Sequence, residues 1–154
     1  MAHQYFDSSA LVKRYVAEVG AAWVQGLCAP TAGHIIYTVR ISGAEIVAAL
    51  FRRLRVGAIS ITDAQAAAVQ FRADFRNDYQ IVEVTEALID RAMTLAEEHG
   101  LRGYDSVQLA AALELQTLRA SLSLPPVTFI SADEMLNKAA IAEGLQAENP
   151  ADHP

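Results

Sequence analysis

Four acidic side chains of this sequence occur where a folded chain could bring them together. Asp7 directly follows a short apolar segment, residues 3–6, and precedes a segment with helical character; Asp133 follows residues 127–131 in the same way. Because the carboxyl ends of parallel strands lie along one edge of an α/β sheet, both aspartates are expected at that edge. Asp105 lies in the first turn of a predicted helix and can face the same edge.

Each aspartate alone could simply cap a helix, since aspartate between a strand and a helix commonly does so. Glu45 is harder to explain in that way. It shares a predicted helix face with Ile41, Ala48 and Ala49, and a carboxylate buried on such an apolar surface without a partner is costly. Arg52 is poorly spaced for a salt bridge to it. A metal ion or a metal-bound water is therefore the more economical partner for Glu45.

Four converging carboxylates would repel one another, and such a cluster would not help to form a hydrophobic core. A hard divalent cation does require such a set, because Mg²⁺ and Mn²⁺ prefer oxygen ligands and retain bound water. An ion of this kind can activate a water molecule, orient a phosphate and stabilise charge on a leaving oxygen. The four acids therefore predict a site for Mg²⁺ or Mn²⁺ that acts on a phosphate ester.

The rest of the sequence supplies the elements that must position these acids. Short β-like runs alternate with longer helical ones, which is typical of a layered α/β domain. No internal repeat or linker interrupts the pattern, so we expect one domain, with Thr62 and Asp63 capping its Ala-rich helix. Strands are predicted at residues 3–6, 34–39, 80–84 and 127–131, and helices near residues 8–15, 23–27, 42–55, 62–75, 85–95 and 105–120 and from 133 onward.

The composition agrees with one folded domain and sets weak limits on its function. The chain has 154 residues, of which 53% are hydrophobic and 19% charged, so it has ample material for a core. Its net charge of −6 argues only weakly against a nuclease, because metal-loaded carboxylates attract phosphate locally. No apolar run is long enough to cross a membrane, no signal-peptide pattern is present, and the single cysteine, Cys28, suits a reducing, cytoplasmic location.

Four segments of the sequence resemble, in order, the motifs of PIN-domain ribonucleases, in particular the VapC-type toxins of prokaryotic toxin–antitoxin pairs. They are residues 5–13 (YFDSSALVK), 41–46 (ISGAEI), 102–110 (RGYDSVQLA) and 129–136 (FISADEML). Each segment is weak evidence alone, but the ordered set spans nearly the whole chain. The resemblance implies a PIN-like α/β/α sandwich with a mainly parallel sheet. We expect this nuclease domain to occupy residues 1–148, followed by a frayed polar tail at residues 149–154.

The resemblance also implies an activity, a cofactor and partners. It implies a metal-dependent endoribonuclease in which Asp7 and Asp105 bind Mg²⁺ (or Mn²⁺) directly. Glu45 and Asp133 would hold metal-bound waters, a second ion or the attacking water, and Ser9 and Ser131 match small hydroxyl positions near the site. It further implies a homodimer and a cognate antitoxin protein. An arginine of that antitoxin, inserted among the carboxylates, would compete with both the cation and the RNA substrate.

Basic side chains near the acidic motifs are candidates for contact with RNA phosphates. Arg52, Arg53 and Arg55 form the densest cluster, and Arg52 lies roughly on the face of Glu45. The cluster could equally be a solvated helix C-terminus that the helix dipole favours. Weaker candidates are Lys13, Arg14 and Arg102.

Three other functions stay open at this point. A phosphohydrolase with Asp7 as nucleophile would usually carry a second aspartate two residues on, where this sequence has Ser9. A non-catalytic binding module would have no reason to keep four mutually repelling acids. A housekeeping RNA-processing nuclease would share the whole site. Apolar helical segments at residues 23–27 and 50–54 are candidates for a groove that receives a partner protein.

Overall fold

The central feature of the fold is a five-stranded sheet in which every pairing is parallel. A computed structural model describes all residues, 1–154. The strand order is β3-β2-β1-β4-β5, so the first strand of the chain lies in the middle of the sheet. The strands are β1 (His3–Phe6), β2 (Ile35–Val39), β3 (Gln80–Val82), β4 (Thr128–Ile130) and β5 (Gln146–Glu148).

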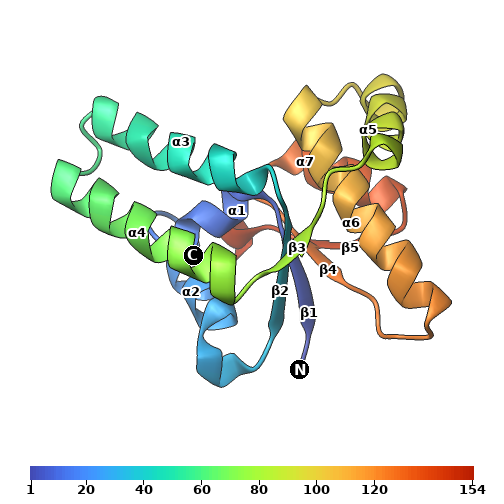
Figure 1. Ribbon diagram of the computed structural model, residues 1–154, viewed down its shortest axis with the longest axis horizontal. Helices are drawn as coiled ribbons and strands as arrows, with labels where there is room; N and C mark the ends of the chain where they lie inside the picture. The colour runs from blue at the N-terminus through green and yellow to red at the C-terminus, as the bar shows by residue number, and fades with distance from the viewer.

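Helices cover both faces of this sheet (Figure 1). One face carries α1 (Ser8–Leu11), α2 (Ala21–Cys28), α3 (Ser42–Arg55) and α4 (Ile61–Asn77); the other carries α5 (Glu86–His99), α6 (Gly103–Ser121) and α7 (Glu134–Ala142). The connections also contain 3₁₀ turns at Val12–Arg14, Pro30–Ala32 and Pro150–Asp152. The predicted α/β/α sandwich is confirmed.

The alternation of side chains along the strands builds a separate core on each face. Tyr5 and Phe129 belong to a cluster of 18 buried residues beneath α5, α6 and α7. Phe6 and Ile130, their neighbours in sequence, belong to a cluster of 14 buried residues on the side of α1 to α4. Parallel sheets are normally covered on both faces, which is why β1 is apolar at successive positions. Its burial fixes the position of Asp7 at the end of the strand.

Several element boundaries differ from those predicted. Ser60, rather than Thr62 and Asp63, caps α4: its side chain accepts a hydrogen bond from the backbone N–H of Asp63. The third strand ends at Val82 instead of residue 84, and the first helix ends at Leu11 and continues only as a 3₁₀ turn. Strand β5 was not predicted, because its sequence, Gln-Ala-Glu, has no apolar alternation.

The C-terminal residues do not form the frayed tail that the sequence suggested. They form a 3₁₀ turn in which Pro150 is buried, and the ring of His153 stacks on Trp23 with centroids 4.1 Å apart. A side chain at Gly20 would collide with the Pro150 carbonyl, 2.4 Å from an added Cβ, and Gly20 also has a φ of +82°. The end of the chain is therefore packed on α2. The boundary at residue 148 stays a prediction.

The apolar segments proposed as a partner groove are largely core. Val24 and Leu50 are both fully buried on the α1-to-α4 side of the sheet. These two side chains are therefore unavailable to a partner helix, whereas Trp23, Leu27 and Leu54 are only partly buried, so the groove stays a prediction. None of the helices combines the length and the apolar character that crossing a membrane would require.

Candidate active site

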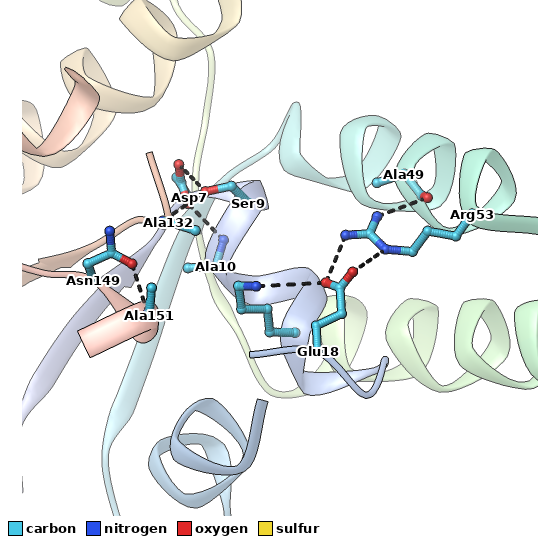
Figure 2. A network of polar contacts seen from close by, with 10 residues as sticks. Asp7, Ser9, Ala10, Glu18, Ala49, Arg53, Ala132, Asn149 and Ala151 are labelled. Carbon is cyan, nitrogen blue, oxygen red and sulfur yellow. Dashed lines mark hydrogen bonds and ion pairs between the residues drawn. The ribbon is translucent and has the colours of Figure 1, made fainter. Parts of the chain in front are cut away.

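Asp7 lies at the carboxyl end of β1, where its carboxylate also caps α1. The side chain is almost fully buried, with 2% of the residue exposed. Ser9 Oγ lies 2.7 Å and 2.9 Å from its two oxygens, Ser131 Oγ donates to Oδ2 over 2.7 Å, and the Ala10 N–H donates to Oδ1 over 2.9 Å. Figure 2 shows Ser9 and Ala10 around this carboxylate. The capping interpretation is thus correct for Asp7, but it accounts for only one of these contacts.

The electrostatics of Asp7 are those of a carboxylate without a counter-ion. Burial raises its pKa to about 7, although the hydrogen bonds from Ser131, Ser9 and Ala10 lower it. The negative charge of Asp105 raises the pKa further. No cation of the protein neutralises Asp7, so the ionised form is costly in the metal-free protein.

Asp133 follows β4, the strand next to β1, and caps α7 by accepting from the Leu136 N–H over 3.0 Å. The loop before it is tied to Asp7. Its own N–H donates to Ser131 Oγ, and the Ala132 N–H donates to Ser9 Oγ, both over 3.0 Å. The two serines that hydrogen-bond to Asp7 therefore also fix the approach of Asp133 to the site.

Glu45 lies in the first turn of α3, which follows β2 on the other side of β1. Its Oε1 accepts a hydrogen bond of 2.8 Å from Gln108 Nε2 on α6. The carboxylate is partly buried, and burial raises its pKa; Gln108 and Ser8 lower it, and the charge of Asp105 raises it. Glu45, Asp7 and Asp133 thus follow three adjacent strands at the same edge of the sheet.

Asp105, in the first turn of α6, interacts through its charge with each of the other three acids. Its pKa is raised first by burial and then by the charge of Asp133, while Arg102 lowers it. Its own charge raises the pKa of both Asp7 and Glu45. None of the ion pairs in the structure includes any of the four acids. Repulsion between Asp105 and the other acids therefore raises several of their pKa values, and the assignment of the four as site residues stays a prediction.

A cleft of about 680 Å³ opens over these acids. Glu45, Asp105 and Asp133 line it, whereas Asp7 lies beneath its surface and only Ser9, its hydrogen-bond donor, reaches the cleft. Direct contact between Asp7 and a bound ion would therefore require the Ser9 hydroxyl to give up at least one of its two contacts with the carboxylate. The face of α3 that the sequence suggested was apolar forms one wall.

Four basic side chains also line the cleft, namely Lys13, Arg52, Arg53 and Arg102. Arg53 pairs with Glu18 at 2.9 Å, as Figure 2 shows, and Lys13 approaches the same carboxylate at 3.8 Å. Arg52 and Arg102 have no ion-pair partner in the structure. They are the cations most available to an incoming phosphate.

Two of the sequence candidates for RNA contact lie outside the cleft. Arg14 instead donates to the Tyr79 hydroxyl over 2.7 Å and pairs with the buried carboxylate of Asp74 at 3.4 Å. It belongs to a structural network between the first helical segment and α4, so its assignment to RNA is wrong. Arg55 is exposed but does not line the cleft.

Gln108 belongs to the site, although it was not predicted from the sequence. Gln108 is 1% exposed and contacts Glu45, Ser42 and Tyr5 through hydrogen bonds. The available signal was its position, since it is a lone amide within an otherwise apolar run of α6. A buried amide must find hydrogen-bond partners, and here one of them is an acid of the site.

The donor set fits a hard divalent cation held partly through water. All four groups are oxygen donors without a protein cation, and the pKa values of Asp7, Glu45 and Asp105 are raised, as expected where the balancing charge is missing. No three of the four bring ligand atoms within 4.8 Å of one another. Only Glu98, His99 and Glu143 do so, at the opposite end of α7 from Asp133. Mg²⁺ retains several waters and usually binds only one or two carboxylates directly. It can therefore be held by carboxylates that are too far apart to contact one ion together.

Solved structures share this fold, although no family model and no curated protein matches the sequence. PAE2754 from Pyrobaculum aerophilum superposes with a TM-score of 0.61 at 18% identity, covering 99% of this chain and 94% of the other. A chain of VapBC2 from Rickettsia felis, solved bound to a DNA fragment from its promoter, superposes with a TM-score of 0.59 at 13% identity, covering 97% and 98%. The protein therefore has the fold of VapC-type PIN domains.

Proposed function

We propose that the protein is a metal-dependent endoribonuclease and the toxin of a toxin–antitoxin pair. The observation that carries the proposal is the set of four carboxylates that includes Asp105, at the carboxyl edge of a parallel sheet and without any ion pair to a cation of the protein. Such an arrangement destabilises a protein unless a cation binds there. The shared fold supports the class of nuclease, and the uncommitted Arg52 and Arg102 support a phosphate-bearing substrate.

Each residue of the site has a role in this proposal. Asp7 and Asp105 hold Mg²⁺ or Mn²⁺, which supplies an activated water and stabilises charge on the leaving oxygen when bound. Ser9 and Ser131 hold the Asp7 carboxylate in place. Glu45 and Asp133 accept hydrogen bonds from waters in the cleft.

The raised pKa of Glu45 suits it to take the proton of the attacking water. Hydrolysis would leave a 5′-phosphate and a 3′-hydroxyl. Arg52 and Arg102, together with Lys13, would bind phosphates of the RNA strand.

The geometry supports this function over a phosphohydrolase and over a non-catalytic binding module. A phosphohydrolase with Asp7 as nucleophile would usually carry a second aspartate two residues on, where this chain has Ser9, whose hydroxyl is hydrogen-bonded to the Asp7 carboxylate. A non-catalytic module would keep the mutual repulsion of the acids without any compensating ligand.

The metal requirement is tested by removing divalent ions. Protein treated with a chelator and dialysed is expected to lose cleavage of single-stranded RNA, and Mg²⁺ or Mn²⁺ should restore it. The measurement is the rate of product formation on a gel, with end-labelling to identify the 5′-phosphate. Full activity in the metal-free protein would contradict the mechanism.

We further propose that a partner protein blocks the site with a cation. Arginine matches carboxylates with paired, charge-assisted hydrogen bonds, and none of the four carboxylates of the site forms an ion pair within the protein. The VapBC2 structure was solved with a DNA fragment from its promoter. This supports a DNA-binding antitoxin as the partner. Assembly as a homodimer and a cytoplasmic location stay predictions.

The partner proposal predicts a growth phenotype. Expression of the chain alone is expected to arrest bacterial growth, whereas expression together with the small protein encoded beside it should not. Asp7→Asn should abolish the arrest, and colony counts with protein levels by immunoblot provide the measurement. If the chain alone is harmless while the purified protein cuts RNA, a housekeeping nuclease replaces the toxin.

A further inference from the structure

A fully buried amide connects the floor of the cleft to the core. Gln108 Oε1 accepts from the Tyr5 hydroxyl over 2.8 Å, and Gln108 Nε2 lies 2.8 Å from both Glu45 Oε1 and Ser42 Oγ. Both hydrogens of the amide nitrogen are therefore in use. Gln108 does not line the cleft, so it reaches the site only through Glu45.

The partners of this amide allow only one of its two orientations. Tyr5 is fully buried and its pKa is raised well above the ordinary value by burial, so its hydroxyl keeps its proton and donates it to Oε1. A flipped amide would place its carbonyl oxygen against the carboxylate of Glu45, two acceptors in contact. The Tyr5 hydroxyl thus orients the Gln108 amide so that its N–H group faces Glu45.

The other hydrogen of the amide continues into a chain of hydroxyl groups. Thr38 Oγ1 lies 2.7 Å from Ser42 Oγ and 2.9 Å from the carbonyl oxygen of Phe6. The Thr38 hydroxyl is the donor in both contacts, so its single hydrogen is shared between Ser42 Oγ and the Phe6 carbonyl oxygen, and Ser42 Oγ accepts from both Thr38 and Gln108. Phe6 is the residue before Asp7. The network therefore joins Glu45 to the strand that carries Asp7.

We infer that Gln108 is a positioning residue, which holds Glu45 in a single orientation toward the cleft relative to Asp7. The inference rests on the proposed nuclease function. Glu45 has no ion pair, and the hydrogen bond from Gln108 stabilises its carboxylate more than the one from Ser8, so the Gln108 amide is the main group that fixes its orientation. A rotating Glu45 would spend less time where it can accept a proton from the attacking water.

The first test is Gln108→Met, which keeps the volume and the unbranched shape of the side chain but removes both N–H groups. We expect kcat for RNA cleavage to fall by about 10- to 100-fold, the usual cost of losing an outer partner of a metal site. KM for RNA should stay unchanged, because Gln108 cannot touch the substrate. An unchanged kcat, or a rise in KM alone, would overturn the inference.

A matched control separates positioning from general loss of stability. Gln116 lies on the same helix, and its Oε1 accepts from the Val127 N–H over 2.9 Å, away from the cleft. Gln116→Met should lower the melting temperature and leave kcat unchanged. If Gln108→Met does not fold, Tyr5→Phe removes only the hydroxyl that orients the amide and keeps the stacking on Phe129. Tyr5→Phe should lower kcat below that of the parent protein, again without a change in KM, and an unchanged kcat would overturn the inference.

A second readout needs neither metal nor RNA. In the metal-free protein, the side-chain NH₂ signals of Gln108 in a ¹H–¹⁵N spectrum should move on Glu45→Ala and stay in place in an exposed variant such as Asp90→Asn. Unmoved signals would overturn the contact itself. If the parent protein cuts no RNA, the proposed function fails while this spectrum still decides the contact. If it cuts RNA and Gln108→Met keeps its kcat, the inference alone fails.

Discussion

Asp105→Asn is expected to lower the rate of RNA cleavage by about a thousandfold or more, because it removes the acid around which the site is arranged. Loss of a residue that hydrogen-bonds to a metal ligand lowers activity about 10- to 100-fold, and loss of the ligand itself lowers it more. The asparagine keeps the size of the side chain and relieves repulsion from Asp7, Glu45 and Asp133. The fold should therefore persist, and the melting temperature should not fall.

The measurement combines single-turnover cleavage of single-stranded RNA with thermal denaturation of the same sample. Asp90→Asn is the matched control, since Asp90 is an exposed aspartate on α5 outside the cleft, and it should change neither quantity. An Asp105→Asn protein that is unfolded would show that this acid is structural. One that is folded and fully active would exclude it as a metal ligand.

Asp7→Asn is expected to stabilise the metal-free protein, by an amount that grows as the pH rises. The folded-state pKa of Asp7 is about 7, whereas the unfolded value is near 3.8, so the folded protein holds this proton more tightly. The contribution of protonated Asp7 to the free energy of unfolding is therefore complete below about pH 4 and is lost as the pH rises through 7. The pKa difference corresponds to a penalty on the order of 4 kcal/mol for the ionised parent, which the neutral amide avoids.

Chemical denaturation in chelator at pH 5 and at pH 8 measures this difference. The gain for Asp7→Asn should be larger at pH 8, and adding Mg²⁺ at pH 8 should stabilise the parent but not the variant. Asp90→Asn should show no such pH dependence. A variant that is less stable than the parent at pH 8 without metal would mean that the hydrogen bonds of Asp7 outweigh its repulsion.

The parts of the fold that could be predicted from sequence are those with local signals. Strand and helix alternate with clear periodicity through β1, β2, α3 and β4, and the position of an acid directly after a strand located Asp7 and Asp133. The grouping of Glu45 with them followed from the cost of a carboxylate on an apolar helix face.

The remaining features depend on contacts between distant segments. Gln108 contacts Tyr5 and Glu45 only when α6 packs against β1 and α3. Residues 146–148 form the strand β5 only because they pair with β4. The packing of His153 on Trp23 joins the C-terminal residues to α2, which no local pattern encodes. Shielding of Asp7 by Ser9 likewise requires the folded loop after β4.

The central place of β1 has a consequence for when the protein can become active during its synthesis. The first strand to leave the ribosome pairs with β2 on one edge but must wait for β4 on the other, where Gln4 lies opposite Thr128. Pairing of segments so far apart in sequence is slow, because a long loop must close first. Asp133 follows that late strand, and β5 completes the sheet only after it. A nascent or prematurely terminated chain therefore lacks the assembled acids, and the candidate site forms only after β4 and Asp133 have been synthesised.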